Sequence, residues 1–497
     1  MPDRLYLTTA IPFVNGAPHL GHALEFVETD ALARHARARG RAVRFLTGTD
    51  EHAAKNVHAA RAAGADVAAF VAGNAARFRA LADDLAVSYD DFIRTSADPR
   101  HRPAVEEIWR RCVESGDLYR REYVGWYCAG CEEFYDPDTL AGGRCPEHDA
   151  ALARIEEDNW FFRLSRYRDV LAGLIADRRL RIEPEARRNE VLGFLAGAVR
   201  DVSVSRPRGR VHDWGIPVPD DPEQIVYVWF DALTNYVSAL GYGGPDESAY
   251  RAWWLDADAR THVIGKGIVR FHAVIWPAIL LAAGQPLPTT LFVHDYVSVD
   301  GRKIGKSLGN AVDPTALIAG YGVDALRWWL CREVPRVGET DFTEPRLLAC
   351  ADRDLANGVG NLVQRVVTLA SRAFGADPIH EAPASELSVV CAATRERIDD
   401  VLAAFDLRAA TEALIALIDA VNREVETTRP WELLRAPEAN ERARAVLAPL
   451  VGAVRVIGNE LEPFVPALAA RVRERVGCAG EPVHPGEPVQ SRLTGAA

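Results

Sequence analysis

The chain has 497 residues, of which 48% are hydrophobic and 26% are charged, as is usual for water-soluble globular proteins. This length predicts several domains, and no apolar run is long enough to cross a bilayer. The net charge of −12 argues against a generally basic nucleic-acid coat, although a local stripe of arginines would still meet a phosphate backbone. The N-terminus lacks a basic region before an apolar core, so we expect no signal peptide and a cytoplasmic protein.

The first predicted elements alternate between strand and helix. Residues 4–14 are rich in β-branched and aromatic side chains and predict a buried strand. Residues 23–39 predict a helix that ends at Gly40, and residues 42–47 predict a second strand. This order predicts a βαβ unit and a doubly wound parallel sheet, whose ligands bind beyond the carboxyl ends of the strands. The motifs HLGH and GTDEH both follow such ends.

From about residue 118 the sequence is rich in aromatic residues, glycine and cysteine, and then in arginine, which predicts an insertion into the sheet domain. Strand patterns resume at 225–230, 261–265 and 289–293, which we expect to complete the sheet. Beyond residue 345, apolar residues recur at three- and four-residue spacing. That spacing predicts an antiparallel helix bundle.

Within the insertion, four residues have the spacing of a metal site. Two short pairs, Cys128 with Cys131 and Cys145 with His148, are separated by 13 residues. This spacing allows four tetrahedral ligands, and ligation by four protein side chains is typical of structural zinc. Clustered cysteines in a chain without signs of secretion favour metal over disulfides, and unrelated thiols are the alternative. We predict one structural Zn²⁺ per chain, which would stabilise an insertion too small for a good core.

Two further motifs have the chemistry of a phosphate site. His19, Gly21 and His22 lie on the predicted strand-to-helix turn, where the glycine admits a ligand and the helix N-terminus adds positive potential. Residues 301–310, GRKIGKSLGN, hold Lys303 and Lys306, two of only four lysines in the chain. Paired lysines on a glycine-rich loop suggest a clamp on a compact anion. Ordinary surface histidines and a solvated loop are the alternatives.

HLGH after the first strand, combined with a late Lys-x-x-Lys-Ser loop, resembles the two signature motifs of class I aminoacyl-tRNA synthetases. TAIPFVNGAPHLGHA, FLTGTDEH, YVWFDALTNYVSAL, the cysteine–histidine knot and TRPWELL further resemble the methionyl-tRNA synthetase family, from Leu5 to about residue 470. The resemblance implies a methionine–tRNA ligase. It would activate L-methionine with ATP and Mg²⁺ to methionyl-adenylate and transfer the methionyl group to the 3′ end of tRNA(Met).

The same resemblance implies site residues. ATP would contact His19, Gly21, His22 and Lys306, and Lys306, with Lys303 beside it, would stabilise the charge that builds on the α-phosphate. Asp50 would bind the substrate ammonium, and the amino-acid pocket would be lined by Ile11, Phe13, Trp229, Ala232, Tyr236, His272 and Trp276. The anticodon would be read by Arg372, Asn422, Arg429 and Trp431. For the pocket residues around Trp229, the alternative is a strand and a helix that are merely buried. For Trp431, the alternative is a tryptophan that fills the bundle core.

We therefore expect an α/β fold with a doubly wound, Rossmann-like parallel-sheet catalytic domain, a zinc-bearing insertion and an α-helical bundle. We expect the two halves of the catalytic domain at 1–117 and 221–294, and the connective insertion with the zinc knot at 118–220. The KIGKS loop with its connecting segment is expected at 295–345, and the helical anticodon-binding domain at 346–497. We expect no further C-terminal tRNA-binding or dimerisation domain, and therefore a monomer; we also expect no membrane partner.

Several residues depart from the family pattern. Phe13 stands where a tyrosine is typical, Ala53 replaces a glycine, and Asp295 stands where the family often has glycine. Gly267 replaces an aspartate expected to hold the ATP ribose, and the usual Lys-Met-Ser-Lys-Ser loop is changed at Ile304 and Gly305. These departures leave a second hypothesis open: a repurposed paralogue that binds tRNA without charging it, or that activates a different amino acid in specialised metabolism.

Overall fold

The computed structural model describes residues 3–128, 133–135, 144–145, 151–304 and 311–493. The chain divides into two compact units. We call the first the sheet unit, which comprises Met1–Pro18, Gly40–Ala80 and Tyr89–His294. The second is the helical unit, which comprises His19–Arg39, Leu81–Ser88 and Asp295–Ala497. Among the helices of the described ranges, none is both long and apolar enough to cross a membrane.

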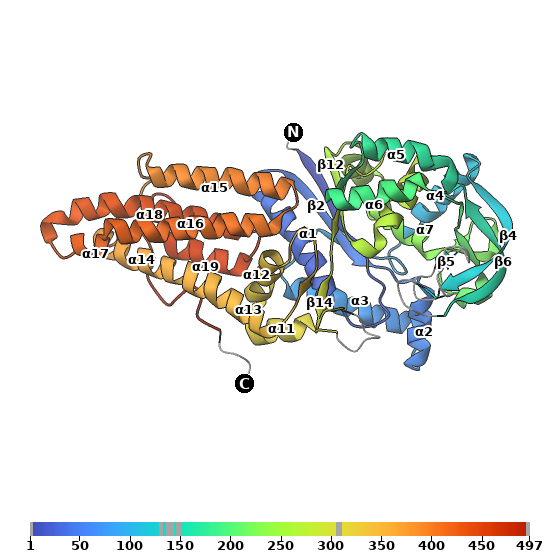
Figure 1. The fold of residues 1–497 in the computed structure, drawn as a ribbon, viewed down its shortest axis with the longest axis horizontal. Coiled ribbons are helices and arrows are strands. Elements are labelled where there is room, and N and C mark those ends of the chain that lie inside the picture. Colours follow the sequence, from blue (N-terminus) through green and yellow to red (C-terminus); the bar gives the residue numbers. More distant parts are fainter. Residues whose placement is uncertain (1–2, 129–132, 136–143, 146–150, 305–310, 494–497) are drawn as a thin grey trace. The chain divides into compact units, whose positions relative to one another are not determined.

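A six-stranded parallel sheet forms the centre of the sheet unit (Figure 1). Its strand order is β3-β2-β1-β12-β13-β7, with bounds Asp91–Arg94, Ala42–Thr49, Arg4–Thr9, Ala259–Gly265, Thr290–His294 and Arg181–Glu183. In β1, Thr8 pairs with Leu46 on one side and with His262 on the other. On one side of β1 lies β2, which follows soon after it in the sequence. On the other side lies β12, which begins only at residue 259. Such a reversal point, at the carboxyl ends of parallel strands, is where ligands of open α/β sheets bind.

The predicted strands at 261–265 and 289–293 are confirmed as β12 and β13, and the parallel sheet is as predicted. The strand predicted at 225–230 is wrong in its extent and its partners. Strand β11 ends at Val226 and lies in a separate antiparallel sheet. From Val228 the chain is helical, because the N–H groups of Phe230 and Asp231 both donate to the carbonyl of Tyr227. An apolar run that is buried on all sides does not distinguish strand from helix.

Two small antiparallel sheets form within the predicted insertion and directly after it. One has the order β5-β4-β6-β8, with bounds Glu133–Tyr135, Leu118–Cys128, Ala153–Phe162 and Val202–Ser203. The other has the order β10-β11-β9, with bounds Pro217–Val218, Asp221–Val226 and Ser205–Pro207. Strand β7 lies within the same stretch of sequence, yet it pairs with β13 of the main sheet.

Helices cover the strands of the sheet unit around one large hydrophobic core, in which Trp109, Trp254 and Trp276 are almost fully buried. The α-helices are α2, α4, α5, α6, α7, α8, α9 and α10, with bounds Ala54–Ala62, His101–Glu114, Arg168–Ala176, Glu185–Ala196, Val228–Leu233, Asn235–Ser238, Ser248–Tyr250 and Trp276–Ala282. Short 3₁₀ or π segments are η3, η4, η5, η6 and η7, with bounds Leu164–Tyr167, Arg208–Val211, Arg251–Leu255, Lys266–Ile268 and Phe271–Ile275. Helix α3 (Val67–Asp84) begins in the sheet unit and ends in the helical unit.

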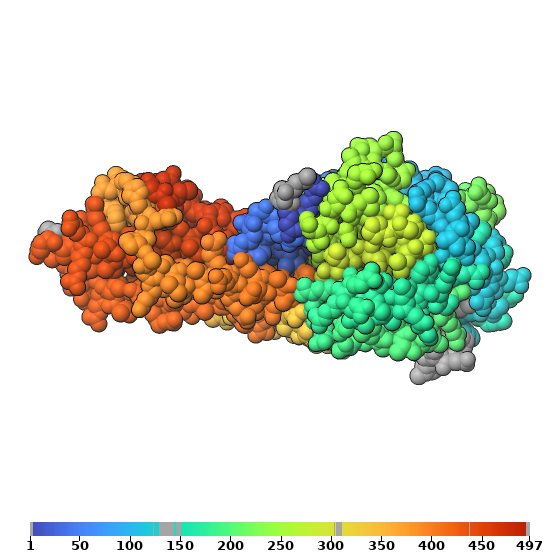
Figure 2. Space-filling model, turned by 90° about the horizontal axis from the view of Figure 1, so that it is seen from above, coloured from blue at the N-terminus to red at the C-terminus, as the bar shows by residue number. Residues whose placement is uncertain are grey.

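The helical unit contains the predicted bundle. Long helices α14, α15, α16, α18 and α19 pack side by side (Figure 1), with bounds Asn361–Phe374, Glu386–Ala403, Leu407–Thr428, Asn440–Leu461 and Pro466–Val476. Helix α16 shows why the spacing of apolar residues predicted a helix. Its buried residues lie at helical spacing along one face and include Leu414, Ile418, Val421 and Val425. In Figure 2 the bundle appears as one continuous orange and red surface.

Shorter elements precede the bundle in the helical unit. They are α1, α11, α12 and α13, with bounds Leu20–Ala38, Pro314–Tyr321, Val323–Glu333 and Glu344–Ala351, and a small sheet of β15, β14 and β16, with bounds Arg302–Lys303, Val297–Val299 and Thr340–Asp341. The π-helical segment Asp352–Gly360 leads into α14, and Pro430–Leu433 (α17) and Pro437–Ala439 follow α16. Helix α1 is fixed to α12 by an ion pair of 2.7 Å between the buried side chains of Asp30 and Arg327.

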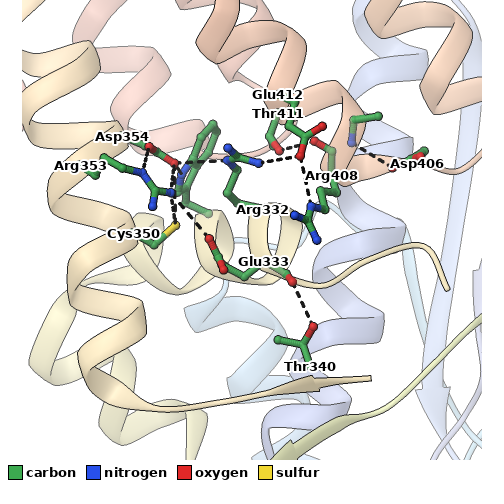
Figure 3. Close-up of polar contacts among 12 residues, drawn as sticks. Arg332, Glu333, Thr340, Cys350, Arg353, Asp354, Asp406, Arg408, Thr411 and Glu412 are labelled. Carbon is green, nitrogen blue, oxygen red and sulfur yellow. Dashed lines mark hydrogen bonds and ion pairs between the residues drawn. The ribbon is translucent and has the colours of Figure 1, made fainter. Parts of the chain in front are cut away.

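A polar network holds these shorter elements against the bundle (Figure 3). Arg332 of α12 pairs with Asp354 of the π-helical segment at 3.4 Å and with Glu412 of α16 at 3.2 Å. Its neighbour Glu333 pairs with Arg353 and accepts, through its carbonyl, the hydroxyl of Thr340 in β16. The sheet of β14, β15 and β16 is therefore connected to α12 through the backbone carbonyl of Glu333, and α12 is connected to α16 through the side chain of Arg332.

Candidate active site

Asp50 lies at the carboxyl end of β2 and is 2% exposed. Its backbone N–H donates to the carbonyl of Pro12 at 3.0 Å, and Asp50 forms a parallel bridge with Phe13. One oxygen of its carboxylate accepts the N–H of His52 at 3.2 Å. The ends of β1 and β2 are thus joined, and they place a carboxylate at the reversal point of the sheet.

The aromatic residues predicted to line the amino-acid pocket form one cluster in the sheet unit. The ring of Trp229 lies edge-on to Phe13 at 5.9 Å and to His272 at 6.4 Å between centroids. Tyr236 contacts Trp276 at 6.2 Å. Of the two remaining predicted residues, Ile11 packs against the same core and Ala232 is buried on α7. Three separate segments of the chain therefore supply one aromatic wall.

This wall is uncharged at neutral pH. Nδ1 of His272 lies 3.0 Å from the carbonyl of Ile268, which only accepts, so Nδ1 carries the hydrogen. Nε2 then accepts the hydroxyl of Tyr236 at 2.8 Å. Burial lowers the pKa of His272 to about 4, so that the imidazole is neutral at pH 7. The carboxylate of Asp50 is therefore the charge that the predicted pocket residues present.

The sequence motifs did not reveal a second histidine behind the wall. His262 of β12 stacks on Tyr236 with 4.0 Å between ring centroids, and its Nδ1 lies 2.8 Å from the hydroxyl of Thr8. Burial lowers the pKa of His262 well below its ordinary value. The register that pairs Thr8 with His262 explains this contact, and only a known strand pairing could have predicted it.

Asp231, inside the motif FDAL, was also missed. Its two carboxylate oxygens lie 2.6 Å from Nδ1 of His52 and 2.5 Å from Nε2 of His101. His101 continues the network to the hydroxyl of Ser238 at 2.8 Å. Burial alone would raise the pKa of Asp231, but the two histidines outweigh it and hold this pKa well below its usual range. The network connects the turn that carries Asp50 to the helix that carries Trp229.

In the helical unit, the HLGH turn caps helix α1. Nδ1 of His19 accepts the N–H of Gly21 at 3.2 Å, and Nδ1 of His22 accepts the N–H of His19 at 3.0 Å. The rings stack with 3.8 Å between centroids. Because each Nδ1 accepts, each neutral ring carries its hydrogen on Nε2 and offers a donor there. A Cβ at Gly21 would approach the His19 ring to 3.1 Å, so glycine lets the ring take this position.

Within the helical unit, the HLGH turn contacts a residue that follows the lysine loop in the sequence. The N–H of Leu20, between His19 and Gly21, donates to the carbonyl of Val312 at 3.1 Å. Val312 follows closely after the loop at 301–310. The helix N-terminus and the segment leading from the lysine loop therefore lie side by side.

The family model described as tRNA synthetases class I (M) matches residues 5–156 and 149–367. The chain belongs to this methionyl-tRNA synthetase family. It is 37% identical over 483 residues to the methionine–tRNA ligase of Caldanaerobacter subterraneus subsp. tengcongensis, covering 96% of this chain and 74% of that protein. It is 38% identical over 484 residues to that of Mycobacterium tuberculosis, covering 95% and 92%.

A solved structure is similar over almost the whole chain. The methionyl-tRNA synthetase of Mycobacterium tuberculosis in complex with methionyl-adenylate matches with a TM-score of 0.91 and 36% identity. The match covers 98% of this chain and 99% of that chain. The fold of the methionyl-tRNA synthetase family, a parallel-sheet core with a helical C-terminal region, is therefore the fold of this chain.

The structure describes only part of the lysine loop. Lys303 ends β15, which pairs with β14, and Ile304 is buried. Gly305 and Lys306 lie outside the described residues, so the predicted role of Lys306 stays a prediction. The same holds for Cys131 and His148 of the predicted zinc knot.

The other two predicted zinc ligands are described. Cys128 and Cys145 are each 1% exposed and pack with Leu152 in one small hydrophobic cluster. No group of three possible metal ligands occurs in the described part of the chain, which contains only this half of the predicted set. Two separated cysteines that are buried in one cluster fit the donor set of a structural zinc site.

The predicted anticodon residues lie on α14, α16 and α17, or directly after α16. Arg372 is exposed in the last turn of α14, and Asn422 is half-buried on α16. Arg429 follows α16 with a positive φ of 44°, and its side chain is 62% exposed. Trp431 on α17 is half-buried, with the guanidinium of Arg365 5.2 Å from its ring centroid. Trp431 therefore does not fill the bundle core.

The departures from the family pattern have defined surroundings. Phe13 has the ammonium of Lys55 at 3.7 Å from its ring centroid. Ala53 is fully buried at the start of α2, and Gly267 lies in the short helix η6. The carboxylate of Asp295 accepts the N–H of Gly338 at 2.7 Å. A glycine at position 295 would have no side chain to accept this hydrogen bond.

Proposed function

We propose that this chain is a methionine–tRNA ligase. In the first step a carboxylate oxygen of L-methionine attacks the α-phosphorus of ATP, the bond to pyrophosphate breaks, and methionyl-adenylate forms. In the second step a terminal ribose hydroxyl of tRNA(Met) attacks the carbonyl carbon. The ester bond forms, the bond to AMP breaks, and the hydroxyl proton is released. The observation that carries the proposal is a buried carboxylate, Asp50, at the sheet reversal beside an uncharged aromatic wall.

This arrangement suits methionine at both of its ends. The carboxylate of Asp50 pairs with the substrate ammonium. The rings of Phe13, Trp229 and Tyr236 favour contact with a polarizable thioether. The indole N–H groups of Trp229 and Trp276 are buried without a hydrogen-bond partner among the described residues, so the wall retains donors for a weak acceptor such as sulfur.

The phosphates of ATP are assigned to the HLGH turn and the lysine loop. His19 and His22 would offer Nε2 donors at a helix N-terminus, and Gly21 would let the phosphate approach. Lys303 and Lys306 would neutralise the charge that develops on the α-phosphate, since phosphoryl transfer depends mainly on positioning and electrostatics. Mg²⁺ bound with ATP would supply further neutralisation of the phosphates.

The remaining assignments concern structure and partners. One structural Zn²⁺ would be held by Cys128, Cys131, Cys145 and His148, and it would stabilise the insertion. The anticodon of tRNA(Met) would be read by Arg372, Asn422, Arg429 and Trp431. We assign the protein to the cytoplasm, as a monomer.

Charging of tRNA tests the proposal directly. The purified protein should attach labelled methionine to tRNA(Met) only when ATP and Mg²⁺ are both present. The product should be lost after mild alkali, which cleaves the aminoacyl ester. Binding of tRNA(Met) without any ester product would instead favour a paralogue that does not charge tRNA.

A further inference from the structure

Glu51, the glutamate of the GTDEH motif, has a fully buried side chain. Nε of Arg94 donates to one oxygen of its carboxylate at 2.7 Å, and Nη2 of Arg94 donates to the other at 3.1 Å. The hydroxyl of Thr49 donates to the first oxygen at 3.0 Å, and the hydroxyl of Ser96 donates to the second. Each oxygen therefore accepts two hydrogen bonds, and the ion pair has the two-pronged geometry that fixes the orientation of a carboxylate.

This cluster joins the carboxyl ends of two neighbouring strands in the sheet unit. Thr49 is the last residue of β2, Arg94 is the last residue of β3, and the two are partners in the parallel register. Directly after β3, the hydroxyl of Thr95 accepts the backbone N–H of Glu51 at 2.9 Å. Both the side chain and the backbone of Glu51 are thus attached to the end of β3, at the same end of the sheet as Asp50.

The backbone around Asp50 is held from other elements as well. The side-chain amide of Asn56, on α2, donates to the carbonyl of Asp50 at 3.2 Å. The indole N–H of Trp214 donates to the carbonyl of Glu51 at 2.6 Å. Within this set of bonds, the carboxylate of Glu51 is fully occupied by its four donors, so it acts on a substrate through the turn that carries Asp50 and not by contact.

A buried ion pair of this kind is a poor source of stability. Taking a carboxylate and a guanidinium out of water costs about as much free energy as their attraction returns, and apolar residues in the same place often give equal stability. The pair does supply one fixed geometry, because two parallel hydrogen bonds fix direction as well as distance. Such a geometry matters here, since the carboxylate one residue earlier is the one assigned to the substrate ammonium.

We propose that Glu51 and Arg94 are positioning residues that orient Asp50 for binding the ammonium of the amino acid. The inference rests on the proposed function, in which Asp50 pairs with that ammonium. The two side chains fix the backbone from which the carboxylate of Asp50 extends. Disrupting their ion pair should therefore weaken binding of the amino acid and leave binding of ATP unchanged.

The first test measures binding of labelled methionine to the full chain by equilibrium dialysis and needs no catalysis. One variant is Arg94→Gln. The other combines Glu51→Gln with Arg94→Gln, which removes both charges so that no unpaired charge stays buried. The Kd for methionine should rise by about 10-fold or more in both variants, because small displacements within a site cost up to about 100-fold. Arg94→Lys restores the charge without the two-pronged contact, so its Kd should lie between these values and that of the unaltered protein.

Arg44→Gln is the matched control. Arg44 also joins β2 to β3, through an ion pair of 3.1 Å with Asp91, and its side chain is 25% exposed against 32% for Arg94. This pair lies toward the opposite ends of the two strands, so general loosening of the sheet would affect Arg44→Gln as well. Arg44→Gln should bind methionine like the unaltered protein. Equal loss of affinity in Arg44→Gln, or no loss in the Arg94 variants, would overturn the proposal.

Methioninol shows whether the effect passes through Asp50. This compound keeps the ammonium and the thioether of methionine but has a hydroxyl in place of the carboxylate. The double variant should weaken binding of methioninol by the same factor as binding of methionine. A loss confined to methionine would assign the ion pair to the substrate carboxylate and overturn the inference.

A second test separates this inference from the proposed function. In methionine-dependent ATP–pyrophosphate exchange, the double variant should have a raised KM for methionine and an unchanged KM for ATP. A rise in both values would indicate general damage to the site and overturn the positioning role. If the unaltered protein neither binds methionine nor supports exchange, the proposed function is rejected and the inference with it. If it does both and the variants behave identically, the inference alone is rejected.

Discussion

A carboxylate oxygen of Asp231 lies 2.6 Å from Nδ1 of His52, although 179 residues separate the two along the chain. Both side chains are largely buried, with exposed fractions of 1% and 11%. His52 in turn belongs to the turn that presents Asp50. Asp231 is therefore a positioning residue for the predicted ammonium-binding carboxylate.

Replacing Asp231 by asparagine removes this charge while keeping the shape. Removing one partner from a buried charged network costs about 3–5 kcal/mol, and we expect a loss of this size in the free energy of unfolding. In protein that remains folded, KM for methionine should rise because Asp50 is no longer held. Urea unfolding and exchange kinetics check both effects, with the surface variant Asp246→Asn as control. Unchanged stability and KM would contradict the positioning role.

Stability should fall on acidification because of His272. Its pKa in the folded protein is about 4, below the ordinary value of 6.5, so the unfolded chain takes up a proton that the native chain does not. This contribution to stability is complete above pH 6.5 and is lost as the pH falls toward 4, amounting to about 3 kcal/mol.

The variant His272→Gln retains hydrogen bonding without titrating in this range. Its free energy of unfolding, measured by urea titration between pH 7 and pH 4.5, should depend less steeply on pH than that of the unaltered protein. His484→Gln, at an exposed site, should keep the original slope. Parallel pH profiles for all three proteins would exclude a neutral buried His272.

Zinc should be lost when Cys128 is replaced by alanine. The unaltered protein should contain one Zn²⁺ per chain by elemental analysis, and Cys128→Ala should contain much less and melt at a lower temperature, because structural zinc contributes to folding. Cys478→Ala, at an exposed cysteine, is the matched control and should retain the metal. Equal zinc content in both variants would rule out Cys128 as a ligand.

Trp431→Ala should affect charging of tRNA and not activation of methionine. Loss of one stacked base is worth roughly 1–3 kcal/mol, so KM for tRNA should rise by about 10-fold or more. ATP–pyrophosphate exchange, which involves no tRNA, should be unchanged. Arg397→Ala, an exposed position on α15, serves as control. A loss of exchange in Trp431→Ala would indicate a structural role instead.

Two kinds of element were predictable from the sequence. Strands β12 and β13 were predicted from short runs of apolar residues, and the bundle helices from apolar residues at helical spacing. The segment 225–230 failed because an apolar run buried on all sides has no period. Strand β7 was missed because three residues within an insertion give no signal for pairing with β13.

The candidate site was predictable only in part. Family motifs placed Phe13, Trp229 and His272 in one group, and the structure brings their rings into contact. The links from Asp231 to His52 and His101 span 179 and 130 residues, and the sequence alone carries no information on such contacts.

The most direct test of the central claim is amino-acid-dependent ATP–pyrophosphate exchange, measured with each of the twenty amino acids at low and at high ATP. A methionine–tRNA ligase should exchange with methionine far faster than with any other amino acid, and Gly267 should make exchange demand high ATP. Exchange with a different amino acid, or with none in folded protein that contains zinc, would contradict the assignment.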